Sequence, residues 1–511
     1  KSMLVNLAKR HRLEKVDPAA ERGPVKEPIV YYVDGAAPEP VRQALIDGVG
    51  WWAEAFDEAG FIDAFRVEVL PANVDPFDMR YNVVNWVNRA TRGWSYGPSI
   101  VDPRTGEILK GSVMLGSLRV RQDIMIFQAL MGAGLTDTGD PNDPVPVALA
   151  RIRQLGAHEV GHTLGLAHNF AASTQDRYSV MDYPAPRVEL VDGKLSIANA
   201  YGVGVGEWDK FAIKYLYAAK TDEEARVMVQ EAQARGLRFA SNADTDGTGA
   251  ANPYGGLWDD GLEPAAELHR VLDVREAALE RFNIDAIPAG QDLASLRRAF
   301  VPIWLLHRYQ TEASAKLLGG VYTPIGLNGD DVAVSKVPAR QQDAALDALM
   351  RALSVETLSI PRHLWHALSY GPRTDYDYST TIEIMPMAGG SVFDPMRAAE
   401  IGAVAVLDNL LAPERLNRLD IQQADGMAAP DVERVLDRLI GHANDSARNG
   451  ALGRRIATTI ALSMAKASRE SALSQSIGMQ MDGRIATWAA ELSRSRAKGA
   501  DGDWARGLGA L

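Results

Sequence analysis

The chain has 511 residues with a formal net charge of −12, and 46% of its residues are hydrophobic and 23% charged, the balance of a globular protein with room for two to four domains of roughly 150 residues. The acidic charge excludes a general nucleic-acid binder, and the lack of any apolar run of about 18 residues excludes a membrane span. Because the chain has no cysteine, disulfides, thiolate metal ligands and a cysteine nucleophile are excluded as well.

The beginning of the chain is charged and loop-like, so residues 1–27 are predicted to form an N-terminal segment outside the first domain. Its opening lacks the apolar core of a signal peptide, which indicates a mature, trimmed or fragmentary chain. A β-branched and aromatic run at 29–33 predicts a strand, and a helical pattern through Trp51 follows it. Two further strands are predicted at 65–70 and 83–87.

The next elements lead up to a long helix. A turn signal at 102–106 precedes an apolar stretch at 108–115 that is predicted to be a strand. A helix is predicted around 124–131, and after a polar loop a long helix is predicted from about 146 to 164. The end of this helix carries the most informative stretch of the chain.

His158, Glu159 and His162 lie there in the pattern His-Glu-x-x-His. Histidines four residues apart project from one face of a helix and can share a metal ion, with the glutamate beside them. A hydrolytic Zn²⁺ site takes three protein ligands and leaves the fourth position to water. Gly165 predicts a sharp turn, because glycine tolerates positive φ, and this turn would bring His168 to the same ion.

Chance is a poor explanation of this pattern. Three of the nine histidines of the chain fall within the eleven residues 158–168, around a glycine in the required place. Downstream, residues 179–184 read Ser-Val-Met-Asp-Tyr-Pro, which matches a tight turn carrying a methionine and, two residues later, a tyrosine.

The pair of motifs resembles the metzincin zinc endopeptidases, whose signature is H-E-x-x-H-x-x-G-x-x-H followed by a Met-turn. The wider arrangement resembles a group of large bacterial zinc-dependent metalloproteases in which a metzincin domain precedes a long helical region. This likeness covers roughly residues 10–330 and includes the turn signal at 102–106. Such proteins are usually exported, so the resemblance implies an extracytoplasmic location, periplasmic or secreted.

The resemblance also implies roles for single residues. Three imidazoles would bind one Zn²⁺ per chain: His158, His162 and His168. Glu159 would be the general base, and Met181 would form an apolar floor under the imidazoles. Tyr183 would reach the metal or the oxyanion of the tetrahedral intermediate, with a buried structural tyrosine as the alternative. Asn169 differs from the residues of the best-known subfamilies, which are therefore no guide to specificity.

The predicted strand at 108–115 is expected to be the edge strand above the cleft. An extended peptide could pair with such an edge by β-augmentation, which would present the scissile carbonyl to the metal. An internal strand with no free edge is the alternative. The substrate-binding residues predicted on this strand are Gly111, Ser112, Val113, Met114 and Leu115.

From about residue 207 onward, apolar residues recur at helical spacing, which predicts the core faces of packed helices. Three such stripes lie at 268–282, 346–353 and 432–440. This half is larger than a metzincin domain needs to close its own core. We expect it to pack against the protease domain and to wall part of the cleft, which would favour extended peptides.

Three further features favour structural roles. Residues 242–247 copy the first half of a calcium loop, but Pro253 stands where the closing glutamate should be, so Ca²⁺ is disfavoured. His363 and His366 could bind a metal but have no acidic or third histidine partner nearby in sequence. The loop at 375–378 could line a substrate pocket, although a packed surface loop is the simpler interpretation.

Together, the sequence and the resemblance predict an α+β fold, with a metzincin-like domain at 28–205 followed by a mainly α-helical region at 206–511. The predicted function is a zinc-dependent endopeptidase acting on peptides or unfolded proteins, in which Glu159 activates water. One alternative is a catalytically silent, protease-like scaffold with a structural zinc, against which the intact Glu159 speaks because a structural site needs no base. The other is a zinc hydrolase of non-peptide amides.

Overall fold

The computed structural model describes residues 6–89, 93–245, 247–326, 332–371 and 384–510. Its contacts divide the chain into two compact units. The first comprises the chain up to Val188 together with Ser196–Ser241, and the second comprises Glu189–Leu195 together with the chain from Asn242 onward. The boundary predicted between a metzincin-like domain at 28–205 and a helical region at 206–511 stays a prediction.

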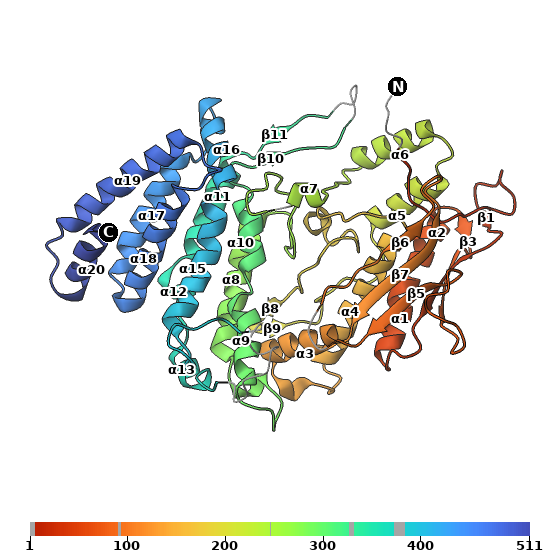
Figure 1. Cartoon of the computed structure of the whole chain (residues 1–511), viewed down its shortest axis with the longest axis horizontal. Helices are drawn as coiled ribbons and strands as arrows, with labels where there is room; N and C mark the ends of the chain where they lie inside the picture. Colours follow the sequence, from red (N-terminus) through yellow and green to blue (C-terminus); the bar gives the residue numbers. More distant parts are fainter. Residues whose placement is uncertain (1–5, 90–92, 246, 327–331, 372–383, 511) are drawn as a thin grey trace. The chain divides into compact units, whose positions relative to one another are not determined.

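A five-stranded sheet is the framework of the first unit (Figure 1), with the strand order β4-β2-β5-β7-β6. The first four of these strands are parallel to their neighbours, and β6 runs antiparallel to β7 at one end. The strands are β2 (Ile29–Val33), β4 (Phe65–Val69), β5 (Asn82–Val87), β6 (Ser99–Val101) and β7 (Ile108–Gly116). A small parallel pair joins β1 (Gly23–Pro24) to β3 (Phe61–Ile62).

Parallel strands need a crossover connection, and between β2 and β4 the helices α1 and α2 supply it. The helices and helical turns are α1 (Val41–Gly50), α2 (Trp52–Glu58), α3 (Leu118–Met131), η1 (Ala133–Leu135), α4 (Pro144–Thr163), η2 (Ala172–Gln175), α5 (Glu207–Ile213), the π-helix η3 (Lys214–Ala218) and α6 (Asp222–Ala234). Helices α1, α2 and α4 share one buried core with β2, β5 and β7. Within it, Trp52 Nε1 donates to Ala157 O of α4 at 2.8 Å. The α+β fold is confirmed, and α4 is fixed against the sheet.

The prediction of an edge strand at 108–115 is wrong. β7 lies between β5 and β6, and the amides of Ser112 and Met114 donate to carbonyls of the segment that leads into β6, at 3.0 and 2.9 Å. Its backbone is therefore occupied throughout the predicted substrate-binding stretch, which is Gly111, Ser112, Val113, Met114 and Leu115. Strand order depends on pairing between segments far apart in sequence. β6 has only three residues, which is too short for a strand pattern to be recognised in the sequence.

The second unit is built mainly of helices (Figure 1). They are α7 (Asn242–Thr245), α8 (Pro264–Arg281), η4 (Ile284–Ala286), α9 (Ser295–Trp304), α10 (Arg308–Ala315), α11 (Ala339–Ala352), α12 (Val355–Leu358), α13 (Arg362–Ala367), α15 (Pro395–Leu410), α16 (Pro413–Ala424), α17 (Val432–Ala447), α18 (Gly450–Ala467), α19 (Gln475–Ser493) and α20 (Gly499–Ala510). Two short two-stranded sheets pair β8 (Glu189–Val191) with β9 (Lys194–Ser196), and β10 (Val321–Tyr322) with β11 (Ser335–Lys336). None of the helices in the described ranges is long and apolar enough to cross a membrane.

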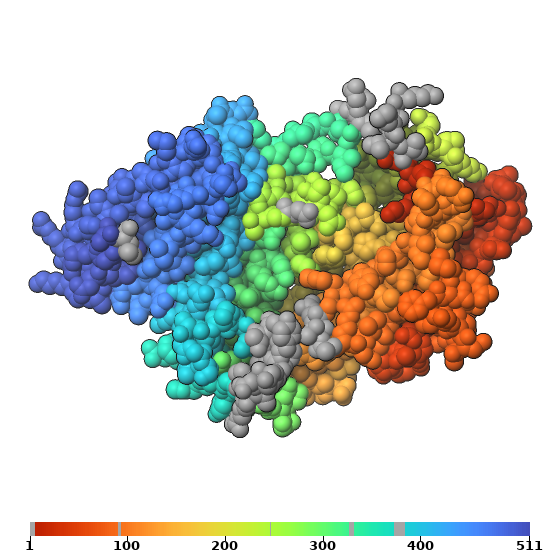
Figure 2. Space-filling model, viewed as in Figure 1, coloured from red at the N-terminus to blue at the C-terminus, as the bar shows by residue number. Residues whose placement is uncertain are grey.

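The three predicted apolar stripes are confirmed as core faces, because their apolar residues on α8, α11 and α17 are buried. In Figure 2 the C-terminal helices of this unit, α17 to α20, form one continuous blue surface. Arg275 lies within the first stripe and is buried too. Its guanidinium donates to Trp304 O at 2.7 Å and to Thr357 O at 2.8 Å, and thereby ties α8 to α9 and α12.

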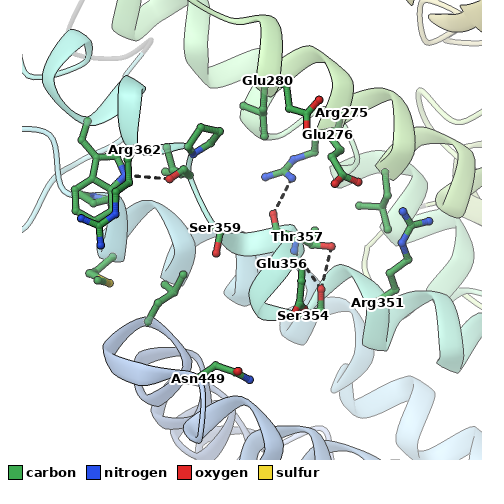
Figure 3. Close-up of a pocket in the computed structure, with 18 of the residues that line it drawn as sticks. Arg275, Glu276, Glu280, Arg351, Ser354, Glu356, Thr357, Ser359, Arg362 and Asn449 are labelled. Carbon is green, nitrogen blue, oxygen red and sulfur yellow. Dashed lines mark hydrogen bonds between the residues drawn. The ribbon is translucent and has the colours of Figure 1, made fainter. Parts of the chain in front are cut away.

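A cavity of about 860 Å³ lies beside Arg275, walled by α8, α12, α13 and the start of α18 (Figure 3). Its charged lining residues balance each other, three arginines against three glutamates: Arg275, Arg351, Arg362, Glu276, Glu280 and Glu356. Among the described residues, these glutamates form no group of potential metal ligands, and no histidine lines the cavity. The mixed charges give no field of one sign.

Candidate metal centre

The helix predicted from about 146 to 164 forms as α4, and local sequence defines its start. Asp143 caps it, because its carboxylate accepts from Val145 N at 2.9 Å. Pro144 fills the first position, where a backbone N–H would have no helical partner. Near the other end, the rings of His158 and His162 lie 4.8 Å apart between centroids. The i, i+4 spacing thus places both imidazoles together, as predicted.

Gly165 ends the helix with a left-handed turn at φ +105°. A Cβ atom at this position would lie 2.0 Å from Lys9 O, so only glycine fits. Beyond the turn, His168 Nε2 comes within 3.1 Å of His162 Nε2. One ligand atom from each of the three histidines lies within 4.8 Å of the other two. The structure therefore brings together the three predicted ligands.

Backbone carbonyls orient two of these rings. His158 Nδ1 donates to Val180 O at 2.7 Å, and His162 Nδ1 donates to Leu166 O at 2.9 Å. With the protons on Nδ1, the Nε2 lone pairs are free to bind a metal. The Nε2 lone pairs of His162 and His168 would repel each other at 3.1 Å without a cation or proton between them. The donor set thus fits Zn²⁺, which imidazole nitrogens commonly bind.

Burial sets the protonation of the cluster. It lowers the pKa of His158 well below its usual value, with the neighbouring imidazoles adding to the effect, and it lowers the pKa of His162 to about 4. Neutral imidazole is the form that binds a metal. Glu159 is buried beside these rings, and burial raises its pKa to about 7 against the opposing charge of Arg151.

Asp209 on α5 accepts hydrogen bonds from two residues of the Met-turn. Its carboxylate accepts from Ser179 Oγ at 2.5 Å, from Val180 N at 2.9 Å and from Gly206 N at 2.8 Å. Burial raises its pKa to about 6, although these three donors favour the ionised form. Because Val180 O in turn accepts from a histidine of the cluster, Asp209 fixes the partner of that ring. The sequence analysis missed this residue.

Met181 and Tyr183 both lie in the predicted turn. Met181 is fully buried, and a Cβ on Gly161 of α4 would lie 2.3 Å from its sulfur, so this glycine makes room for it. The Tyr183 ring lies 5.3 Å from that of His158 and 4.7 Å from that of His168. The positions are those expected of a floor and of an oxyanion partner, and both roles stay predictions.

Asn169 has a structural environment. Its side-chain amide donates to Arg238 O at 2.9 Å, and its side-chain oxygen accepts from Ala240 N at 3.0 Å and Ala171 N at 3.2 Å. These bonds attach the segment after His168 to residues 238–240. Asn169 thereby helps to hold the third histidine in place.

Arg151 is a second residue that the sequence analysis missed. It lies on α4 seven residues before His158, about two helical turns away on the same face. It is buried, and its Nε and Nη1 atoms are sealed from solvent and have no hydrogen-bond partner among the residues that the structure describes. Its charge lowers the pKa of Glu159 and acts against the rise at Tyr183. The helical spacing from His158 was the signal that could have identified it.

A buried lysine contacts a backbone carbonyl of the calcium-like loop. Residues Asn242–Thr245 form α7, and the buried Lys316 Nζ donates to Gly255 O at 2.6 Å and to Thr245 O at 3.4 Å. Asp246 lies outside the described residues.

Among the described residues, His363 and His366 belong to no group of three or more potential metal ligands. The Nε2 atom of His363 lies 3.1 Å from Phe282 O. Within the part of the chain that the structure describes, the three clustered histidines are the one group of potential metal ligands found. The loop at 375–378 lies outside that part.

One of three comparisons with known proteins found a match. Searches of the curated proteins and of the solved structures found no match. A family model described as Met-zincin matches residues 140–450, which is more than half of the chain and includes the histidine motif and the Met-turn. The chain therefore belongs to the Met-zincin family.

Proposed function

We propose that the chain is a zinc-dependent endopeptidase. The observation that carries this proposal is the convergence of three imidazoles beside the buried carboxyl group of Glu159, with two rings oriented through Nδ1 by backbone carbonyls. Membership of the Met-zincin family supports zinc as the metal. A site that only stabilised the fold would need no carboxylic base.

The metal would be held by His158, His162 and His168, where Zn²⁺ supplies a Lewis acid for the scissile carbonyl and for water. Glu159 takes a proton from the water molecule as the water oxygen attacks the carbonyl carbon. It then gives this proton to the amine nitrogen as the C–N bond breaks. Glu159 is restored at the end, so the sum of the steps is hydrolysis of one peptide bond.

Tyr183 would act on the carbonyl oxygen. Its ring lies beside the rings of His158 and His168, with centroids 5.3 and 4.7 Å away, which supports this role. A tyrosine hydroxyl there can donate a hydrogen bond to the oxygen as it gains negative charge, and such a bond is stronger in the transition state than in the ground state. Tyr183 would then lower the barrier without being essential for metal binding.

An extended substrate would pair with β6, not with β7. Among the described residues, β6 is hydrogen-bonded to β7 on one side and has no strand on the other. The segment before it passes close to the backbone of α4, because a Cβ on Gly97 would lie 2.2 Å from the main-chain carbonyl oxygen of Glu159. A peptide added to this edge would run beside the histidine cluster, with backbone hydrogen bonds giving affinity.

The test separates the base from the ligands. Glu159→Gln should keep the zinc and the fold and should lose turnover of an unstructured peptide library by about 10²- to 10⁴-fold. Glu54→Gln, at an exposed carboxylate paired with Lys210, is the control and should cleave like the parent. Cleavage by Glu159→Gln at the parent rate would show that another group is the base.

The two alternative functions give different results in the same assay. A zinc-loaded parent that hydrolyses small amides but no peptide would be a hydrolase of non-peptide substrates. A parent that holds zinc and hydrolyses neither would be a scaffold with a structural metal.

A further inference from the structure

The last carbonyl groups of α4 are satisfied in two ways. The final four carbonyls of a helix have no partner within the helix. The amides of Gly165 and Leu166, in the turn, donate to the carbonyls three and five residues before them, both at 3.1 Å. The carbonyls of Thr163 and Leu164 instead accept from side chains of distant segments.

His11 and Tyr217 provide these side chains. His11 Nε2 lies 3.0 Å from Thr163 O, and the Tyr217 hydroxyl donates to Leu164 O at 2.9 Å. The His11 backbone amide donates to the Tyr217 hydroxyl at 3.2 Å, which joins the two donors. Both residues are buried. An unpaired carbonyl at this depth would be costly, so the two contacts matter for the position of the helix end.

Tyr31 lies beside the same carbonyl. Thr163 Oγ1 donates to Val160 O at 2.8 Å, and the Tyr31 hydroxyl lies 2.7 Å from Thr163 Oγ1 and 3.3 Å from Thr163 O. Because a carbonyl oxygen only accepts, His11 Nε2 at 3.0 Å is the closer donor to Thr163 O. Burial lowers the pKa of His11 to about 4, which favours its neutral ring.

The segment that carries His11 also contacts the turn itself. Lys9 O occupies the space where a Cβ of Gly165 would be. The amide of the first residue of β7 donates to Arg10 O at 2.8 Å. The guanidinium of Arg10 donates to Leu216 O at 2.7 Å. Residues 9–11 are thus attached to the sheet, to the π-helix η3 and to the turn.

We propose that residues 9–11, with Tyr31 and Tyr217, form a clamp that positions the metal ligands, and that His11 is its central positioning residue. This inference rests on the proposed zinc site. His162 Nδ1 donates to Leu166 O, just beyond the turn, and His168 follows two residues later. A shift of the turn would therefore misplace two of the three ligands, while His11 itself touches neither of them.

The experiment compares two variants of His11 in the full chain. His11→Phe keeps an aromatic ring and removes the N–H donor, and His11→Gln restores an N–H donor of similar reach. Zinc transfer to a chelator should be about 10-fold faster from the Phe variant than from the parent, which is the lower end of the effect of losing a group that supports a metal ligand. Transfer from the Gln variant should be close to the parent rate. In the metal-free proteins, hydrogen exchange of residues 160–168 should be faster in the Phe variant alone.

Val84→Ala is the control for general destabilisation. Val84 is fully buried in the same core and lies on β5. Its truncation should lower the melting temperature without changing zinc transfer or exchange at residues 160–168. Tyr217→Phe, which removes the donor to Leu164 O, is the second clamp variant and should show the same faster zinc transfer and hydrogen exchange as His11→Phe. It takes the place of His11→Phe in the test if His11→Phe does not fold.

Three results would overturn the clamp. These are parent-like zinc transfer and exchange in both clamp variants, failure of His11→Gln to restore either quantity, and an equal effect of Val84→Ala at equal loss of stability. If the parent itself binds no zinc, the proposed function fails, and hydrogen exchange in the metal-free proteins still decides whether the clamp holds the turn.

Discussion

Two pairs of histidines lie at helical spacing in this chain. His158 and His162 are four residues apart on α4, and His363 and His366 are three residues apart on α13. The α4 histidines use Nδ1 for backbone carbonyls and keep Nε2 for the cluster. His363 instead has its Nε2 atom 3.1 Å from Phe282 O. The backbone partner thus decides which ring nitrogen remains for a metal.

The two helices also differ at their ends. α4 ends at a left-handed glycine, and the chain turns back to add a third imidazole. α13 (Arg362–Ala367) has a right-handed cap at Leu368, as α4 has at Leu164, but the residue after it, Ser369, does not have a positive φ. In α4, helical spacing supplies two potential ligands, and the turn at Gly165 brings the third to the same point.

The largest expected effect is the loss of the metal. The parent should hold about one zinc per chain, and His162→Ala should hold close to none, because a catalytic site needs three protein ligands. His363→Ala should hold as much zinc as the parent. Elemental analysis of the purified proteins measures this. A lower zinc content in His363→Ala would break the comparison.

The turn can be tested by adding one methyl group. Gly165→Ala should lower the free energy of unfolding by at least about 3 kcal/mol and should release zinc, because the new Cβ meets a carbonyl oxygen at 2.0 Å. Gly450→Ala is the matched control. The φ of Gly450 is +72°, but an added Cβ would meet no atom within 4 Å among the described residues beyond its chain neighbours, so the cost should be about 1 kcal/mol. Denaturant unfolding gives both values, and equal costs would refute the role of the close contact.

The support of the Met-turn should depend on pH. Asp209 has a pKa of about 6 in the folded chain and an ordinary value near 3.8 when unfolded, so its contribution to stability is complete below pH 4 and is lost as the pH rises through 6. The change should approach 3 kcal/mol, at about 1.4 kcal/mol for each pKa unit. Unfolding of metal-free parent and Asp209→Asn at pH 4 to 7 measures it. A constant difference between the two proteins would contradict the prediction.

The smallest effect is expected at Tyr183. Tyr183→Phe should keep the zinc and lower kcat by about 10- to 100-fold with little change in KM, because the hydroxyl would bond mainly to the charged oxygen of the transition state. Steady-state cleavage of a fluorogenic peptide measures both constants. An increase in KM at unchanged kcat would mean that Tyr183 contributes to substrate binding instead.

The sequence by itself determined the local parts of the site. The spacing of His158 and His162, the glycine at 165 and the position of His168 are properties of one short stretch, since helical geometry and the freedom of glycine at positive φ act between near neighbours. The same holds for the apolar stripes of α8, α11 and α17. A regular period of 3.6 residues is visible without knowing the partner helix.

Only the tertiary structure decided what lies around these local elements. β7 was predicted to be an edge strand, and β6 covers it, because strand order depends on pairing between distant segments. His11 and Asp209 act on the site from positions far away in the chain, through a helix-end carbonyl and through the Met-turn. Hydrogen bonds of this kind depend on where the fold places a donor and an acceptor, and no periodic pattern in the sequence marks them.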